Sequence, residues 1–376
     1  MSCACGKRAS YRCATPKHLL TTVGTMTVAR RYYACRHCGR KRTPFDAWAG
    51  LAADAIQVTP HARRVIVTVA TAWSFDRAAV KLKEVCHISV SDDTIERVCQ
   101  HEGESARRWL RGRPQTARAF AAAPGAAEFY SDGLKVNTTG GWREMRLNLL
   151  QKREPAAPAT PAQWKDRVLP EAGVRLASCA IADSRLTGAM WKRWSTCMGL
   201  AGSSDLSVIA DGAPWIWEQA RRRLSPKAQW CVDVYHVSQH VHDAAKAMFG
   251  EGAVARSWAE GQVDRLVAAG GPGYLAELDR QIAAAAAAAA APTHAQALTH
   301  LRGYLDANRD RMWYPDRLSA GTPIGSGAIE AACKKVGARL KLNSARWRTR
   351  RAERFGALLC LDYADQMPAY WADRAA

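Results

Sequence analysis

The sequence predicts an α/β protein in which a mixed sheet is covered by helices. Short runs rich in β-branched and aromatic residues gather between residues 127 and 234, and helical patterns dominate the chain before and after them. The composition agrees, because 48% of the 376 residues are apolar and 23% are charged, which is enough to bury a core and argues against global disorder. The predicted strands of the sheet are residues 127–131, 142–150, 175–182, 206–210 and 229–234.

The chain is strongly basic, with 54 Lys and Arg against 34 Asp and Glu and a formal net charge of +20. Such an excess points to a polyanionic partner, and nucleic acid is the first choice. The longest apolar run, residues 282–291, is nearly all alanine and is half the length of about twenty residues that a bilayer span needs. Because the first residues also lack the apolar stretch of a secretory signal, we expect no membrane partner and a cytoplasmic protein with reduced cysteines.

Residues 1–50 form a small basic module with ten Lys or Arg and one acid. Its cysteine pairs predict a zinc-clipped β ribbon, although the first pair is separated by one residue where two are usual. The predicted zinc ligands are Cys3, Cys5, Cys35 and Cys38. Cys13 or His37 could substitute for one of them, and scattered reduced thiols are the alternative. The predicted strands of the ribbon are residues 19–28 and 30–34.

Residues 51–124 are predicted to form a helical domain that binds DNA. A helix over residues 76–85, a turn, and a second helix over residues 92–101 have the pattern of a helix-turn-helix, with Ser91 as a plausible cap. A plain helical hairpin has the same pattern, and the net charge favours DNA contact. Residues 107–124, rich in Arg, Ala and Pro, are interpreted as a linker or a basic connecting helix.

Three acids are candidates for a catalytic site. Asp132 and Asp211 each precede a glycine at the end of a predicted strand. Asp-Gly is ordinary turn chemistry, but neighbouring strand ends of an α/β layer can also bring two carboxylates together. Glu330 lies in the first turn of a predicted helix, where an acid also stabilises the helix alone. Converging carboxylates favour hard cations among them, and two magnesium ions would activate a water or sugar hydroxyl for phosphoryl displacement.

Four blocks of the sequence surround these acids. They are Tyr130-Ser131-Asp132-Gly133, residues 210–217, residues 232–236, and residues 325–341 with 345–347. Together they resemble blocks of bacterial insertion-sequence transposases, nearest to the Kra type of the Mutator-like DDE superfamily. The resemblance implies a ribonuclease-H-like catalytic core in which Asp132, Asp211 and Glu330 bind Mg²⁺ or Mn²⁺. It also implies an all-helical insertion between the second and third acids, which matches the 119-residue interval between them.

The same resemblance draws attention to Asp233 and His236, an Asp-x-x-His element just after the second acid. We expect them to support the site rather than bind metal, with His236 orienting DNA phosphate or a carboxylate. A satisfied polar pair at the rim of the core is the alternative. Nine Lys or Arg lie between residues 334 and 354, and they either meet phosphate or only solvate the helix. The candidates for DNA contact among them are Lys334, Arg339, Lys341 and Arg346.

The sequence therefore predicts a DNA transposase that binds element ends and joins them to double-stranded target DNA. A homo-oligomer in the synaptic complex and a location at the bacterial nucleoid follow from the resemblance. The alternative is a catalytically silent, sequence-specific DNA-binding protein derived from a transposase, and an RNA-binding protein is a weaker third choice. The predicted parts are the zinc-ribbon-like module (1–50), the helical domain (51–124), the first part of the core (125–236), the helical insertion (237–318), and the last part of the core with its basic helix (319–376).

Overall fold

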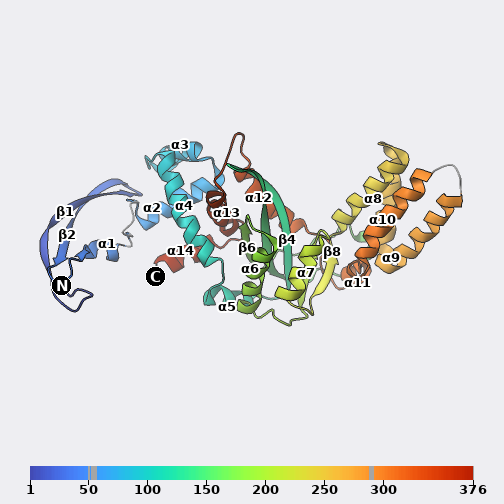
Figure 1. The fold of residues 1–376 in the computed structure, drawn as a ribbon, viewed down its shortest axis with the longest axis horizontal. Helices are drawn as coiled ribbons and strands as arrows, with labels where there is room; N and C mark the ends of the chain where they lie inside the picture. Colours follow the sequence, from blue (N-terminus) through green and yellow to red (C-terminus); the bar gives the residue numbers. More distant parts are fainter. Residues whose placement is uncertain (50, 52–56, 288–291, 376) are drawn as a thin grey trace. The chain divides into compact units, whose positions relative to one another are not determined.

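Figure 1 shows a computed structural model of the chain, which describes residues 1–49, 51, 57–287 and 292–375. The chain divides into two compact units. Unit 1 comprises residues 1–108, 137–141 and 336–376, and unit 2 comprises residues 109–136 and 142–335. Residues 288–291, the end of the polyalanine run, lie outside the described residues, as does residue 50 at the first predicted boundary.

Unit 1 begins with a long antiparallel hairpin of β1 (Ala9–Thr21) and β2 (Gly24–Cys35), and β3 (Lys41–Arg42) pairs with β2. The hairpin turns at residues 22–23, so the predicted single strand over residues 19–28 was wrong. The reason is that Thr22 and Val23 are themselves strand-forming residues and hide the turn. The only strong local signal is Gly24, whose φ of 104° is accessible to glycine.

The remaining described helices of unit 1 include the two predicted for the helix-turn-helix. They are α1 (Pro44–Trp48), α2 (Pro60–Ala72), α3 (Phe75–Cys86), α4 (Asp92–Trp109), α13 (Thr349–Tyr363) and α14 (Met367–Ala375). The turn between α3 and α4 begins at His87, whose left-handed φ of 54° ends α3, and Ile88 is buried under it. Both helices predicted for this region, and the turn between them, are therefore present.

Unit 2 contains a mixed five-stranded sheet, as expected for an α/β protein. Its strands are β4 (Ala126–Thr138), β5 (Gly141–Arg153), β6 (Val174–Ala180), β7 (Leu206–Ala210) and β8 (Gln229–Val232). The strand order is β6-β5-β4-β7-β8. β5 pairs antiparallel with β6, and a two-residue loop joins β4 to β5, which only antiparallel neighbours allow. β7 is parallel to both β4 and β8, so the carboxyl ends of these three strands meet at one edge.

Helices connect and follow these strands. They are α5 (Pro114–Ala122), α6 (Ser184–Cys197), α7 (Pro214–Arg223), α8 (Val234–Phe249), α9 (Ala253–Ala287), α10 (Pro292–Ala307), α11 (Tyr314–Ser319) and α12 (Gly327–Leu340), with short 3₁₀ turns at Pro161–Gln163 and Arg309–Arg311. Sequence reasoning missed α6, although Asp183 caps it by accepting a hydrogen bond from the N–H of Leu186 at 2.8 Å. The basic segment before the sheet contains the connecting helix α5.

Helices α8, α9 and α10 pack side by side and make up most of the predicted helical insertion (Figure 1). α9 is kinked at Gly270, whose φ is 68°, two residues before Pro272. The core around the sheet is apolar, and every residue of β7 is buried. Trp191 of α6 packs on Phe129 of β4, and its indole N–H donates to Asn148 Oδ1 at 2.8 Å. Within the described part of the chain, no helix combines the length and apolarity needed to cross a membrane.

Candidate functional site

The sheet of unit 2 brings Asp132 and Asp211 to neighbouring strands. β4 and β7 run parallel with Tyr130 opposite Ile209, and each acid is two residues further along its own chain. Asp211 directly follows the last residue of β7, as predicted. Asp132 was expected at a strand end but lies inside β4, because pairing with β5 carries the strand past the Asp-Gly pair. The two carboxylates nevertheless stand at the same level of the sheet.

Each of these carboxylates is oriented by local hydrogen bonds. Asp132 Oδ1 accepts from the N–H of Gly133 at 2.6 Å, and Asp132 Oδ2 accepts from the Cys333 thiol at 3.4 Å. Asp211 Oδ1 accepts from the N–H of Ala213 at 2.9 Å, which closes the turn into α7. The hydroxyl of Tyr304, on α10, donates to the carbonyl oxygen of Asp211 at 3.4 Å. The helical segment thus contacts the turn that carries the second acid.

Asp233 occupies the equivalent place on the third parallel strand and holds the start of α12. Val232 pairs with Ala210, so Asp233 stands beside Asp211. Its side chain is 4% exposed, and Oδ2 accepts from the Ser326 hydroxyl at 2.8 Å. Oδ1 accepts from the N–H groups of Tyr235 at 3.1 Å and Ser326 at 3.2 Å. Because Ser326 directly precedes α12, Asp233 fixes the first turn of that helix, in which Glu330 lies.

The three predicted acids influence one another electrostatically. Burial is the largest cause that raises the pKa of Asp132, whereas hydrogen bonds from Gly133 and Cys333 lower it. The negative charges of Asp211 and Glu330 raise it further, and the net direction is upward. Burial also raises the pKa of Asp233, and the charge of Glu330 adds to this. The fold therefore brings four acids near enough for their charges to interact, although they are separated by up to 198 residues in the sequence. They are Asp132, Asp211, Asp233 and Glu330.

The carboxylates do not form a closed ligand set in this conformation. A metal site needs at least three His, Cys, Asp or Glu side chains whose ligand atoms lie close together. Among the described residues, the group whose ligand atoms all lie within 4.8 Å of one another is made of cysteines and contains none of these acids. The ligand oxygens of Asp132, Asp211 and Glu330 therefore do not all lie within 4.8 Å of one another. Their oxygen atoms are the ligands that Mg²⁺ and Mn²⁺ prefer, and the unfavourable charge at Asp132 is the kind that a cation relieves.

The other residues that were predicted to contact DNA or to support the acids lie in different parts of the fold. His236 lies in the first turn of α8, and its ring centroid is 5.6 Å from that of His240, which stacks on Tyr304 at 3.7 Å. Lys334 is exposed on α12, one turn beyond Glu330. In unit 1, Lys341 and Arg346 are exposed; Arg346 Nε also donates to the carbonyl oxygen of Thr138 at 3.4 Å.

Arg339 differs from the expectation, because it is a core residue. Its side chain is 6% exposed, and its guanidinium carbon lies 4.9 Å from the ring centroid of Phe75 and 4.7 Å from that of Phe355. Nε donates to the carbonyl oxygen of Ala70 at 3.0 Å. Burial lowers the pKa of Arg339 to about 10. A guanidinium covered by two rings is not presented to phosphate, so its role here is to join helices of unit 1.

The four predicted cysteines of the amino-terminal module come together and could hold a metal ion. The distance from Cys3 Sγ to Cys38 Sγ is 3.5 Å, and that from Cys5 Sγ to Cys35 Sγ is 3.7 Å. Tetrahedral zinc with Zn–S bonds of about 2.3 Å requires sulfur atoms about 3.8 Å apart. Neither Cys13 nor His37, the alternatives considered, belongs to the cluster. The short spacing of the first pair therefore does not prevent the ligands from converging.

The backbone favours the thiolate form of Cys3 and Cys35. A glycine with positive φ follows each pair, at 80° for Gly6 and 70° for Gly39, and allows the chain to turn back toward the sulfur atoms. The N–H of Cys38 is the main cause that lowers the pKa of Cys35, to about 6, and the N–H of Cys5 likewise lowers that of Cys3. At Cys38 the N–H of Arg40 is outweighed by burial and by the neighbouring thiols, which raise the pKa to about 11. Since the thiolate is the form that binds metal, Cys3 and Cys35 are the ligands that the backbone prepares for a divalent cation.

Sequence reasoning missed three residues around the acids, namely Ser326, Cys333 and Tyr304. Cys333 could have been found, because it lies three residues after Glu330 and therefore on the same face of the helix. Ser326 stands between Gly325 and Gly327, directly before the predicted helix that carries Glu330. Nothing in the local sequence marks Tyr304, which reaches Asp211 only because α10 packs back on the sheet.

The chain was compared with models of known protein families and with curated proteins. A scan against models of protein families matches none of them, and a search of curated proteins finds no significant match.

Proposed function

We propose that the chain is a DNA transposase of an insertion sequence, with a ribonuclease-H-like core that cuts and joins DNA strands. The observation that carries the proposal is the placement of the three acids: Asp132 and Asp211 stand at one level on neighbouring parallel strands, and Glu330 lies in the first turn of α12, the helix whose start Asp233 holds. Phosphodiester chemistry on DNA also agrees with the net charge of +20. The ribonuclease-H-like assignment is supported by the strand order, in which a meander of β4, β5 and β6 is extended by two strands parallel to β4.

In this proposal Asp132, Asp211 and Glu330 would hold Mg²⁺ or Mn²⁺ through their carboxylate oxygens. Bound divalent ions supply an activated oxygen nucleophile and stabilise the leaving oxygen of an in-line displacement. The chain's own residues position these ligands: Cys333 donates to Asp132, and Asp233 holds the helix that carries Glu330. Lys334, exposed one turn beyond Glu330, would attract the phosphate of the DNA strand.

The proposed reaction has two phosphoryl-transfer steps with no covalent protein intermediate. In the first, a water oxygen bonds to phosphorus at the element end, the bond from phosphorus to the 3′ oxygen breaks, and the strand leaves with a 3′ hydroxyl. In the second, this hydroxyl bonds to a phosphorus of target DNA and displaces another 3′ oxygen. Because two ends must be brought together, we further propose a homo-oligomer that acts at the bacterial nucleoid, and zinc in the cysteine cluster of the amino-terminal module.

The test uses the full chain and a supercoiled plasmid that carries its gene with native flanking DNA, in magnesium or manganese buffer. We expect cleavage and joining by the wild type, and a loss of at least about a hundredfold in Asp132→Asn, Asp211→Asn and Glu330→Gln. Asp279→Asn, which removes an exposed carboxylate from α9 of the same unit, is the matched control and should remain active.

Gel-shift measurements on the flanking DNA complete this test. Triad variants that still bind but no longer cleave support the proposed role of the acids. A triad variant that joins strands at the wild-type rate removes that acid from the site. Binding by the wild type without any cleavage supports the alternative of a silent DNA-binding protein.

A further inference from the structure

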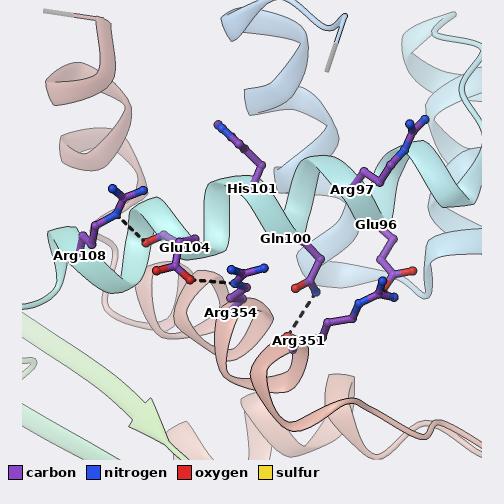
Figure 2. Close-up of a pocket in the computed structure, with 8 residues that line it drawn as sticks. All are labelled: Glu96, Arg97, Gln100, His101, Glu104, Arg108, Arg351 and Arg354. Carbon is purple, nitrogen blue, oxygen red and sulfur yellow. Dashed lines mark hydrogen bonds and ion pairs between the residues drawn. The ribbon is translucent and has the colours of Figure 1, made fainter. Parts of the chain in front are cut away.

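A basic groove lies between α4 and α13 in unit 1, apart from the three predicted acids (Figure 2). It has a volume of about 480 Å³. Four arginines line it against two glutamates, together with Gln100 and His101. The arginines are Arg97, Arg108, Arg351 and Arg354, and the glutamates are Glu96 and Glu104.

The two helices that form the walls of the groove contact each other directly. Gly103 of α4 faces the backbone of Arg354, and a Cβ at this glycine would lie 2.3 Å from the carbonyl oxygen of Arg354. Gln100 Nε2 donates to the carbonyl oxygen of Arg351 at 3.3 Å, which joins the helices a turn away. The groove is therefore formed by two helices that contact each other rather than by loops.

The basic side chains of α4 follow one stripe along the helix. Arg97, His101 and Arg108 are separated by four and seven residues, so they share a face. At a rise of about 1.5 Å per residue the stripe is about 16 Å long, the axial length of four to five base pairs at about 3.4 Å each. Arg97 and Arg108 are exposed.

The glutamates in the groove orient the arginines of α13. Arg351 Nη1 lies 2.7 Å from Glu96 Oε1, and Arg354 Nε lies 2.8 Å from Glu104 Oε2, as Figure 2 shows for the second pair. Arg350 is 3.8 Å from the same carboxylate of Glu104. A guanidinium has five N–H donors, and such a pair occupies only one or two of them. The arginines are thus held in place, and each has more N–H donors than its ion pair uses, as phosphate recognition requires.

If α4 is the second helix of a helix-turn-helix, as the sequence predicts, DNA would contact the amino end of that helix and not the groove. This end carries the exposed residues Asp92 and Asp93, whose negative charges repel phosphate. Ile95, which follows them in the helix, is buried in the core. The positive charge of the helix lies further along, on the stripe that faces α13. Charge and burial therefore favour the groove over the tip of α4 as the surface that meets DNA.

We propose that the groove between α4 and α13 binds the sugar-phosphate backbone of duplex DNA, with Arg97, Arg108 and Arg351 as its phosphate contacts. The inference rests on the proposed function only for the choice of DNA as the polyanion. Binding of this kind positions the duplex and reads no base sequence, so it is measurable with DNA of any sequence.

The first test is fluorescence anisotropy of a labelled 24-base-pair duplex of random sequence, titrated with the full chain at several KCl concentrations. In the double variant Arg97→Gln/Arg108→Gln, we expect Kd at 0.1 M KCl to rise at least about tenfold and the slope of log Kd against log salt to fall by about 2. A Kd and slope equal to those of the wild type, in a variant with wild-type circular dichroism, would overturn the proposal.

A second test uses the two partners of one ion pair. Arg351→Gln and Glu96→Gln break the same pair and should change the unfolding temperature in the same direction. For DNA they should act oppositely: Arg351→Gln weakens binding several-fold, whereas Glu96→Gln, which removes a negative charge from the groove, retains or tightens it. Equal weakening by both variants would contradict the proposal and give the pair a structural role only.

Failure of this inference is separable from failure of the proposed function. If the wild type cleaves DNA and the groove variants bind DNA as the wild type does, the groove is not the DNA-binding surface, and the proposed enzymatic function still stands. Weakened DNA binding in the groove variants of a chain that never cleaves supports the groove and rejects the catalytic activity.

Discussion

Asp233 is a single side chain on which two helices depend. It caps α8 through the N–H of Tyr235 and holds the start of α12 through the N–H and hydroxyl of Ser326, all from a position 4% exposed. A carboxylate that is buried this far is costly unless its oxygens are hydrogen-bonded, and three bonds satisfy it here. Its role in the fold is therefore to position Glu330 relative to the strands that carry the other acids.

We expect Asp233→Ala to lower the free energy of unfolding by about 3 kcal/mol, because three hydrogen bonds to a buried charge are lost. Cleavage should slow as well, since the first turn of α12 loses its anchor. Urea unfolding and the plasmid assay measure the two effects. Asp233→Asn is the matched variant: it keeps the acceptor for the two N–H groups and should lose less of both. An alanine variant as stable and as active as the wild type would rule out the positioning role.

At the scale of elements, the hairpin of β1 and β2 is joined at its base by the cysteine cluster. Cys3 and Cys5 precede β1, Cys35 ends β2, and Cys38 follows it. Only Cys3, Ala9 and Cys35 form a buried cluster here among the described residues, with Tyr33 packed against them. So small a core does not stabilise a module of this size, and a metal ion is the usual substitute.

We predict one zinc ion per chain, released by a thiol-modifying mercurial and measured with a chromogenic chelator. Cys38→Ser should lose most of this zinc because it removes a ligand, and the hairpin should become sensitive to protease. Cys13→Ser, in the exposed part of β1, should keep its zinc and its resistance. Equal zinc content in both variants would show that the metal is held elsewhere.

At the scale of the whole molecule, the pH dependence of stability should reflect Glu102, which is fully buried in unit 1. It receives Arg63 Nη1 at 3.2 Å from α2, and the Tyr370 hydroxyl at 2.7 Å and Arg374 Nη2 at 3.3 Å from α14. Burial by itself raises the pKa of Glu102, but the hydrogen bond from His101, the charge of Arg374 and the hydroxyl of Tyr370 outweigh it and lower the pKa to about 2. The ionised carboxylate is therefore part of what holds three helices together.

A carboxylate whose pKa is lowered on folding contributes stability above its unfolded pKa, about 4.3, and loses that contribution as the pH falls toward 2. The lowered pKa of Glu102 stabilises the folded chain by about 3 kcal/mol at neutral pH. We expect Glu102→Gln to be less stable than the wild type by about this amount at pH 7, and the difference to shrink between pH 5 and pH 3, as measured by urea unfolding. A difference that stays constant over this range would mean that packing, and not charge, is the contribution of Glu102.

Local sequence determined the strands of the sheet and the acids near their ends. The run at residues 206–210 is apolar and short, so its identity as a buried strand needs no information from distant residues. The strand predicted over residues 229–234 is shorter, because it ends at Val232 and Asp233 caps α8. The cysteine pairs are equally local signals, and their convergence was predicted although the first pair is separated by only one residue. The hairpin turn at residues 22–23 and helix α6 were missed because their local signals are ambiguous.

Only the tertiary structure decided which charged residues are buried and which face solvent. Arg339 and Arg351 belong to the same basic stretch of sequence, yet one lies between two aromatic rings and the other lines a groove. Their difference arises from partners at Phe75 and Glu96, more than 250 residues away. Helical periodicity gives each side chain a direction, but burial depends on what packs against that face, and this is a property of the folded chain.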